Sequence, residues 1–464
     1  MTANVAVAPR GIGPNLTDGL ALDDYIRTYA GSEIFQSRSQ PWEEDNPYRR
    51  PLLTEDFAGL NTKTAIPLAG IRSNASLVAN RLLMSIYERD FVFLPASNLD
   101  DKWSDFQTFY GEELRISGEV IRSRLEPYVF SSVEAEFSAS GCWTLDSFEA
   151  YFEEFRTSFT APGNASLMSL IVGAANPVAA AHTYLIQLAG DFLVESSAMA
   201  RNAIGNYGQL QSELFKVIID ECGYGVHPTR HSTLFQKVLT SRGLNPIPHT
   251  YWELYLPSSF YLNNYYSYIC RDHRHLFRYF GAILQVETAF GITCRQMAEM
   301  MRAVFGQDAE VQYFLEHVHI DNHHSRMVLE EIVVPAVKAY GTSILVDILR
   351  GFEESRIVGD VFGTGLREQI AWGDSFFSPS KEDGSSVPVR VAPMVERGLS
   401  GCWTGSKMSG PGATLNVKSG ELDIVAGYGI CATFERGQTV RIPPDVLYAA
   451  CPSADCSYEV DIAS

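Results

Sequence analysis

The segment from Tyr313 to Met327 constrains the fold of this chain more than any other part of the sequence. On a helix, at about 100° per residue, His317, Asp321 and His324 stand at positions i, i+4 and i+7 and share one face. Two imidazoles and a carboxylate on one face are typical ligands of iron, manganese or zinc, whereas a structural zinc site uses thiolates. The segment therefore predicts a helix that forms one wall of a metal site.

The distribution of histidine places this site in the middle of the chain. All 10 His of the 464 residues lie between His182 and His324. Hydrogen-bonded histidines also gather in aromatic-rich cores, so the clustering alone leaves that alternative open.

The formal net charge of −19 limits the partners of the protein. An acidic surface disfavours nucleic acid and anionic membranes, which leaves small molecules as the expected partners. The N-terminus lacks the pattern of a signal peptide, and Pro162 and Pro177 interrupt the charge-free run from Thr157 to Gly190, so we expect a cytoplasmic protein without a membrane span. The 8 Cys include no CxxC pair, and we expect reduced, buried thiols.

The pattern of apolar residues predicts a mainly α-helical chain with a small C-terminal all-β barrel or sandwich. Helical spacing runs from residue 73 to about 137 and from 145 to about 372. A polar, turn-rich linker follows at 378–388, and alternating strands are expected at 413–418, 422–426, 431–435 and 438–442. We therefore expect a helical region at 1–140, a helical domain at 141–377 and a β domain at 389–464.

Three acidic residues stand in apolar helical stretches, namely Glu195, Glu221 and Glu287. Burying a carboxylate is costly unless it is paired or binds a cation. Any one of them could be a surface or helix-end acid. Three on separate helices, beside the face formed by His317, Asp321 and His324, favour metal ligands.

At these residues the chain resembles a known family. The segments 221–235 and 317–327 resemble the haem-oxygenase-like diiron oxidases, and within them the N-oxygenases related to N-nitrosourea synthases and 2-nitroimidazole (azomycin) synthases. The resemblance covers about residues 40–375 and implies a haem-oxygenase-like helical bundle that binds two ferrous ions. The ligands that it implies are Glu195, Glu221, His231, Glu287, His317, Asp321 and His324.

The spacing of Glu221 and His231 requires a break in the helix that carries them. Ten residues of ideal helix leave the two side chains about 80° out of phase. We expect the glycines and the proline of segment 223–228 to interrupt this helix. His227 competes with His231 but is expected to be a core residue or a hydrogen-bond partner of a ligand, and we expect the same of His319 and His323.

The resemblance further implies an O2-dependent enzyme that oxygenates nitrogen in a small molecule. No flavin or nicotinamide fingerprint is visible, so an external reductase or reductant must supply the electrons. The region 1–140 resembles the dimerisation region of the family, which implies a homodimer. Aromatic and amide side chains at 251–255 and 259–266 are candidates for the substrate pocket, with simple core packing as the alternative.

The C-terminal domain resembles a cupin that has lost its metal ligands. Lys407, Ser409 and Tyr448 stand where a family member with three His would bind iron, and no His follows His324. We therefore expect oxidation to stop at nitrogen, without a subsequent rearrangement, and the preferred reaction is 2-aminoimidazole to 2-nitroimidazole. The alternatives are N-hydroxylation of arginine or another amino acid, a diiron oxidase that cleaves C–C bonds, and a metal-binding scaffold without activity.

Overall fold

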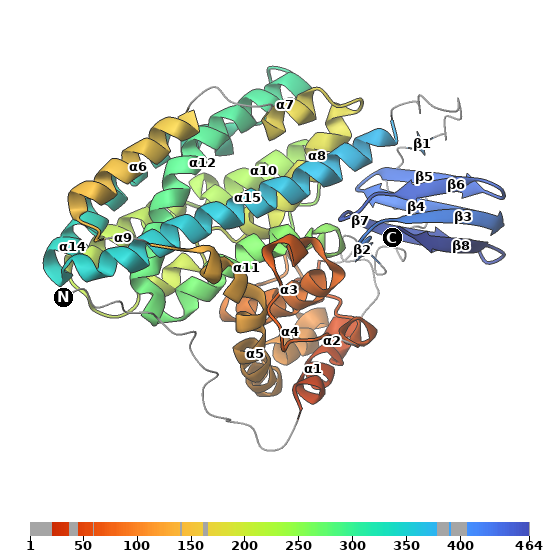
Figure 1. The fold of residues 1–464 in the computed structure, drawn as a ribbon, viewed down its shortest axis with the longest axis horizontal. Coiled ribbons are helices and arrows are strands. Elements are labelled where there is room, and N and C mark those ends of the chain that lie inside the picture. The colour runs from red at the N-terminus through yellow and green to blue at the C-terminus, as the bar shows by residue number, and fades with distance from the viewer. Residues whose placement is uncertain are drawn as a thin grey trace.

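The computed structural model describes residues 21–36, 45–58, 60–139, 142–160, 166–377, 389–390 and 406–463. Helices make up the described chain as far as Ser375, and β-strands follow (Figure 1). The prediction of a mainly helical chain with a small C-terminal β domain is confirmed. The polar linker predicted at 378–388 lies outside the described residues.

The N-terminal region packs against the side of the central helices. Its helices are α1 (Leu22–Ala30), α2 (Glu33–Gln36), α3 (Asn74–Tyr87), α4 (Trp103–Phe109) and α5 (Glu112–Glu136). In α3, the Ser73 side chain caps the helix by accepting a hydrogen bond from the Ser76 backbone N–H. The buried Asn264 amide donates to the Asn80 carbonyl oxygen at 2.9 Å, which ties α3 to α11 of the central bundle.

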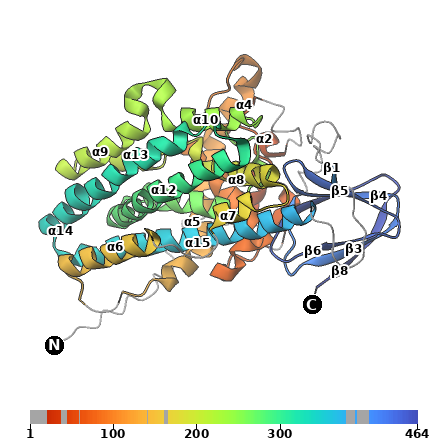
Figure 2. The same cartoon turned by 90° about the horizontal axis from the view of Figure 1, so that it is seen from above.

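The central bundle contains the longest helices of the chain. Its elements are α6 (Leu145–Thr160), α7 (Leu167–Val172), α8 (Pro177–Phe192), α9 (Gln209–Glu221), α10 (His231–Ser241), α11 (Pro257–Arg271), α12 (Leu276–Phe305), α13 (Gln312–Met327), α14 (Val334–Tyr340) and α15 (Leu345–Ser375). Figure 2 shows α9, α13, α12, α15 and α6 running in roughly the same direction, with the β domain at one end of the bundle.

Short turns connect these helices. The 3₁₀ turns are η1 (Thr54–Phe57), η2 (Leu68–Arg72), η3 (Glu88–Asp90), η4 (Asp100–Lys102), η5 (Met199–Ala203), η6 (Gly223–Gly225), η7 (His227–Thr229), η8 (Trp252–Leu254), η9 (His273–His275) and η11 (Thr342–Ile344). A π-helical segment, η10 (Val328–Val333), continues α13 into α14.

Helices α12 and α15 cross at unusually short range because each contributes a glycine at the crossing point. A Cβ atom on Gly281 would lie 1.8 Å from the Ile348 carbonyl oxygen, and one on Gly351 would lie 1.7 Å from the Arg278 carbonyl oxygen. Only a residue without a side chain fits at either position. The crossing fixes the two longest helices of the bundle against each other.

The β domain consists of two antiparallel sheets. Its strands are β1 (Val389–Arg390), β2 (Lys407–Met408), β3 (Ala413–Ser419), β4 (Glu421–Gly427), β5 (Ile430–Glu435), β6 (Thr439–Ile442), β7 (Leu447–Pro452) and β8 (Ser457–Ile462). One sheet has the order β1-β5-β4-β7-β2 and the other β6-β3-β8. Apolar side chains of both sheets, such as Leu415, Ile424 and Phe434, form one shared core.

Strands β3, β4, β5 and β6 were predicted, whereas the two-residue strands β1 and β2 and the longer strands β7 and β8 were not. Most of β7 is buried, because it pairs with β4 and β2 and its backbone contacts α15. Strand β8 is mostly exposed, as an edge strand of polar composition. The period-two signal is weak in a strand that is buried on both faces and in one that is exposed on both.

The β domain docks on the C-terminal half of α15. The Gln369 amide donates to the carbonyl oxygens of Ala426 and Leu447 at 2.8 and 2.9 Å, and its oxygen accepts from the Leu447 N–H at 2.8 Å. The C-terminal end of α15 lies beside the N-terminal end of α8, where the Asp374 carboxylate accepts a hydrogen bond from the backbone N–H of Asn176 at 2.9 Å. These bonds join the sheet, α15 and α8 into one structural unit.

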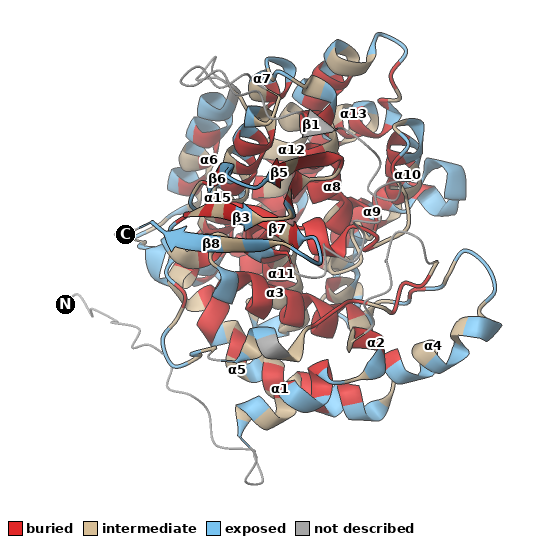
Figure 3. Ribbon diagram, turned by 90° about the vertical axis from the view of Figure 1, so that its right-hand side faces the viewer, coloured by how far each residue is buried: buried red, intermediate tan, exposed pale blue. Residues whose placement is uncertain are grey.

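One apolar core extends from the N-terminal helices through the central bundle. It begins at Ile26 and includes side chains as far along the chain as Cys451 (Figure 3). The boundary predicted at residue 140 therefore crosses a continuous core, and the division into domains stays a prediction. Among the described residues, no helix combines the length and hydropathy needed to cross a membrane.

The prediction of uniformly reduced, buried thiols is wrong. Cys451 is disulfide-bonded, and Cys142 and Cys222 are exposed. Cys270 and Cys294 are buried as free thiols. The prediction relied on the absence of a CxxC pair, which says nothing of cysteines that the fold brings together from distant positions.

Candidate metal centre

Helix α13 turns one face toward the interior of the bundle. His317, Asp321 and His324 on that face are 2, 1 and 0% exposed. The neighbouring His319 and His323 are exposed, and so is His227. The expectation that these three were core residues or hydrogen-bond partners of ligands is therefore wrong, because each lies on the solvent side of its segment.

A first cluster of potential ligands joins four segments of the chain. It consists of Glu195, Glu221, His231 and His317, whose ligand atoms all lie within 4.8 Å of one another. His231 Nδ1 lies 2.7 Å from Glu221 Oε2 and 3.1 Å from His317 Nε2. His317 Nε2 in turn lies 3.2 Å from Glu195 Oε1.

A second cluster shares one residue with the first. Glu221, Glu287 and His324 also place their ligand atoms within 4.8 Å of one another. His324 Nδ1 lies 3.2 Å from Glu287 Oε2. Asp321 belongs to neither of these two groups, but both of its carboxylate oxygens are buried without a hydrogen-bond partner in the described part of the chain. Glu221 therefore stands where two adjacent ions would share a carboxylate.

A break between two helices brings Glu221 and His231 together. Helix α9 ends at Glu221, the turns η6 and η7 follow, and α10 begins at His231. Gly223 has a φ of 60°, and a Cβ there would lie 2.5 Å from the Arg230 nitrogen. Because glycine alone adopts this conformation at this contact, the chain can reverse tightly and return His231 to Glu221. The interruption predicted for this segment is present.

Glu195 reaches the cluster from a turn, not from a helix as expected. Helix α8 ends at Phe192, and Ser196, with a φ of 63°, lies in the turn that carries Glu195. The Tyr313 hydroxyl donates to Glu195 Oε1 at 2.7 Å. The Tyr313 carbonyl oxygen lies 2.9 Å from His317 Nδ1, so that His317 Nε2 faces the cluster.

Tyr313 and Asp220 are absent from the sequence-based set of site residues. Asp220 Oδ2 lies 2.9 Å from His324 Nε2, on the side of the ring that faces away from Glu287. Tyr313 stands four residues before His317, so helical spacing places it on the ligand face and could have identified it. Asp220 precedes Glu221 and carried no comparable signal.

The buried charges show that these side chains fit a cation. Burial lowers the pKa of His317, but the carboxylates of Glu195, Asp321 and Glu221 raise it well above its usual value. Burial, together with the carboxylates of Glu287 and Glu221, raises the pKa of Asp321 well above its usual value, although His317 and His324 oppose this. Both shifts have the same cause, an excess of buried negative charge, which a cation bound among these side chains would neutralise.

The orphaned oxygens of these carboxylates point to the same conclusion. Glu195 Oε2 and both oxygens of Asp321 are buried without a hydrogen-bond partner among the described residues. An unpartnered buried carboxylate oxygen is costly unless it binds a cation. Imidazole and carboxylate ligands suit iron, and two His with one carboxylate are typical of non-haem iron oxygenases. The donor set therefore fits two iron ions, and the assignment of each ligand stays a prediction.

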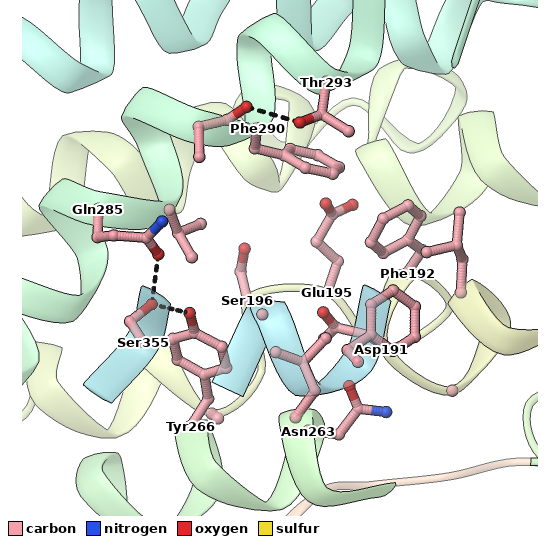
Figure 4. Close-up of a pocket in the computed structure, with 18 of the residues that line it drawn as sticks. Asp191, Phe192, Glu195, Ser196, Asn263, Tyr266, Gln285, Phe290, Thr293 and Ser355 are labelled. Atoms are coloured by element: carbon pink, nitrogen blue, oxygen red, sulfur yellow. Dashed lines mark hydrogen bonds between the residues drawn. The ribbon is translucent and has the colours of Figure 1, made fainter. Parts of the chain in front are cut away.

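A cavity of about 480 Å³ opens beside the clusters. Glu195, Glu221, Glu287 and His317 line it on one side. Figure 4 shows further polar groups around the same space, including Asp191, Ser196, Asn263, Tyr266, Gln285 and Ser355. The cavity therefore gives a small molecule access to the carboxylates of the candidate metal centre.

The aromatic segments proposed for the pocket divide between two roles. Asn263 and Tyr266 of α11 line the cavity. Tyr251, Trp252 and Tyr255 do not line it and belong to the buried core, where packing alone explains them. The segment 251–255 is thus excluded from this cavity.

Comparisons with known proteins agree with the metal-binding geometry. Residues 182–355, which contain every predicted ligand, match a family model described as iron-containing redox enzyme, of the haem-oxygenase type. Over 455 residues the chain is 39% identical to a nitrosourea synthase of Streptomyces achromogenes subsp. streptozoticus, and the alignment covers 95% of each chain. With its two ligand clusters inside a helical bundle, the chain belongs to the haem-oxygenase-like diiron oxidases, as an N-oxygenase of the nitrosourea synthase family.

Proposed function

We propose that the protein oxidises the amino group of 2-aminoimidazole, a small cyclic guanidine, to give 2-nitroimidazole (azomycin). The observation that carries this proposal is the charge of the cavity beside the metal centre. Its lining offers several carboxylates and amides but no unpaired cationic side chain among the residues that the structure describes. Such a cavity favours a cationic nitrogen compound over a substrate that carries its own carboxylate.

Apart from His317 of the candidate metal centre, Arg356 is the one basic side chain among the described residues that line the cavity. Its guanidinium group is already paired, at 2.9 Å from Glu353 Oε2 and 3.0 Å from Asp360 Oδ2. Arginine and other amino acids would bring an α-carboxylate into this acidic space without a free partner, which is unfavourable. The volume of about 480 Å³ would admit either substrate, so charge and not size separates the two candidates.

The seven predicted ligands would form two adjacent iron sites. The first cluster would hold one ion and Glu287 with His324 the other, with Glu221 between them. Asp321 lies among these groups with two free oxygens, available to either ion. The chemistry that two ferrous ions supply at such a site is the activation of O2.

The reaction needs O2 and an external electron donor for each oxygenation. In the first step one atom of O2 forms the new N–O bond of a hydroxylamine, and the other leaves as water with two electrons and two protons from the donor. Two further oxygenations with the same balance, with loss of water from the dihydroxylated nitrogen, give the nitroso and then the nitro compound. The cavity walls contribute by holding one nitrogen in place throughout these steps.

The β domain supports a reaction that ends at nitrogen oxidation. Lys407 and Tyr448, which stand at the positions of cupin iron ligands, face each other as cross-strand partners, with the Lys407 ammonium 5.7 Å from the centre of the Tyr448 ring. The shared core of the two sheets is apolar. A structural role for this domain, as a docking platform for α15, is therefore part of the proposal.

The test is anaerobic reconstitution with Fe(II), followed by exposure to O2 with a reductant and one candidate substrate. We expect two irons per chain and the mass of 2-nitroimidazole from 2-aminoimidazole, with little turnover of arginine. The variant His231→Ala should lose iron, whereas His227→Ala, which removes an exposed imidazole from the same connecting segment, should keep it. Hydroxylated arginine, or a product of C–C cleavage, as the main product would overturn the proposed substrate.

Assembly and location complete the proposed function. The resemblance of residues 1–140 to a dimerisation region supports a homodimer, which light scattering would test. A cytoplasmic location, with a cellular reductase as electron donor, is the arrangement that best supplies ferrous iron and electrons.

A further inference from the structure

The last turn of α8 carries a carboxylate that neither ligand cluster uses. Asp191 lines the cavity, and Figure 4 draws it between Glu195 and Asn263. Among the described residues, no side chain or backbone group donates a hydrogen bond to its carboxylate. Asp191 is therefore an unpaired acid that faces the space where a substrate would bind.

The charge balance of the loaded site singles out this residue. Four of the predicted ligands, Glu195, Glu221, Glu287 and Asp321, are carboxylates, and together they match the charge of two ferrous ions. Asp191 is not in either cluster, so its charge remains when both ions are bound. Asp191 is partly buried, and an uncompensated carboxylate with reduced access to water is unfavourable unless a ligand compensates it.

The cavity wall around Asp191 is built for a flat, polar ligand. The Tyr266 hydroxyl lies 2.6 Å from Ser355 Oγ, which donates to Gln285 Oε1 at 2.6 Å. This chain fixes one polar wall of the cavity, with Asn263 close to Asp191 in Figure 4. A planar ring with N–H groups on its edge could contact Asp191 while its faces meet the apolar part of the lining.

We propose that Asp191 is the substrate-binding residue that selects cationic, guanidine-like compounds and orients them at the metal centre. Its carboxylate would accept two parallel hydrogen bonds, from a ring N–H and from the exocyclic amino group of 2-aminoimidazolium. Since Asp191 and Glu195 both line the cavity, these hydrogen bonds would hold the amino nitrogen beside the carboxylates of the candidate metal centre. The inference rests on the proposed function, because it assigns a residue to the recognition of that substrate class.

The test compares two ligands of similar shape on the Fe(II)-loaded protein without O2. 2-Aminoimidazole is a cation near neutral pH, and 2-aminothiazole is a neutral ring that carries the same amino group. We expect wild type to prefer the cation. Asp191→Asn should lower the affinity for 2-aminoimidazole roughly tenfold to a hundredfold, as expected for loss of a charge-assisted hydrogen-bonded pair. Its affinity for 2-aminothiazole should stay within about twofold of the wild-type value.

Two further variants separate a specific contact from a general effect of charge. Asp347→Asn makes the same substitution at an exposed position of α15 that does not line the cavity, and the binding of both ligands should change by less than about twofold. Asp191→Glu retains the charge and should recover part of the lost affinity. Iron content and thermal unfolding are measured for every variant.

The outcomes distinguish this inference from the proposed function. Wild-type affinity of Asp191→Asn for 2-aminoimidazole would overturn the role of Asp191 while leaving the proposed function in place. Absence of binding of either ligand to the wild type would overturn the proposed substrate itself. If Asp191→Asn fails to fold or to bind iron, the wild-type preference decides: equal affinity for the two ligands overturns the inference, and preference for the cation supports it.

Discussion

Among single residues, Glu221 is the side chain on which both halves of the metal centre depend. It belongs to both ligand clusters and is 7% exposed. Burial alone would raise the pKa of Glu221, but contacts with His231, His317 and His324 lower it below its usual value. The carboxylate is therefore kept ionised, ready to bridge two cations.

Tyr313 positions Glu195, and its hydroxyl can be removed without changing the shape of the core. We expect Tyr313→Phe to weaken the more loosely bound iron by roughly tenfold to a hundredfold, because loss of a hydrogen bond to a ligand typically has that effect. The cost to folding should be about 1 kcal/mol. An anaerobic Fe(II) titration measures the change. Tyr255→Phe is the matched control, since that buried hydroxyl has no partner in the described structure, and equal loss of affinity in both variants would contradict the role of Tyr313.

Sequence reasoning identified residues better than it identified their surroundings. The face of α13 followed from helical spacing, and Glu195, Glu221 and Glu287 stood out as acids in apolar stretches. His231 came only from resemblance, because a spacing of ten residues has no meaning across a broken helix. Asp191 escaped notice because an acid at a helix end is indistinguishable, in sequence, from one that faces solvent.

At the scale of elements, the connection between α9 and α10 determines the geometry of the metal centre. Three consecutive residues of this connection, Gly223, Tyr224 and Gly225, have positive φ, of 60, 54 and 76°. A chain segment of this kind reverses direction within a few residues. The two helices it joins could be predicted from their apolar spacing, but the path between them could not.

Gly223 and Gly225 offer a matched pair of substitutions in this connection. An Ala at Gly223 would place Cβ 2.6 Å from the Thr229 carbonyl carbon, whereas one at Gly225 would meet no atom within 4 Å. Gly225→Ala should therefore cost about 1–2 kcal/mol from its backbone conformation and keep both irons. We expect Gly223→Ala to displace His231 and to lose at least one iron per chain, measured by iron content alongside thermal unfolding. The same iron content in both variants would show that the turn tolerates the displacement.

Strands and turns were harder to predict than helices. Periodic apolar residues in the long helices made their existence clear, and α6 and α15 begin and end within a few residues of the expected limits of the helical domain. Glu195 was expected on a helix because its neighbours are apolar, yet it lies in a turn where side chains pack against the cavity. A run of apolar neighbours indicates that a residue is buried, but residues are buried in turns as well as in helices.

For the whole molecule, the contact between the bundle and the β domain includes a partly buried histidine, His182. The His182 ring stacks on Phe305 with centroids 5.9 Å apart and meets Tyr428 of the β domain edge-on at 6.4 Å. The guanidinium carbon of Arg242 lies over the Phe305 ring, 4.7 Å from the ring centre. Burial, with a smaller contribution from Arg242, lowers the pKa of His182 to about 4.

This shift predicts acid sensitivity of the domain contact. A folded-state pKa below the unfolded value of about 6.5 means that the unfolded chain binds the proton more readily, so stability falls as the pH drops from about 6.5 toward 4. Between pH 7.5 and 5 the loss from His182 should be roughly 2 kcal/mol. His182→Phe should reduce the wild-type loss by that amount, as measured by urea unfolding at both pH values. An equal loss of stability in the variant would show that His182 does not titrate in this range. Because both proteins share all other titratable groups, the contributions of those groups cancel in the comparison.

If Asp191 recognises the substrate and Glu195 binds iron, as proposed, the two functions meet at the C-terminal end of α8, since Glu195 follows Asp191 by four residues. Two ligands that act through the same few residues obey thermodynamic reciprocity: the factor by which iron strengthens substrate binding equals the factor by which substrate strengthens iron binding. Iron that is retained weakly by the free protein would therefore be retained more tightly during turnover. In a cell where ferrous iron is scarce, the supply of substrate would then set the fraction of this enzyme that carries its metal.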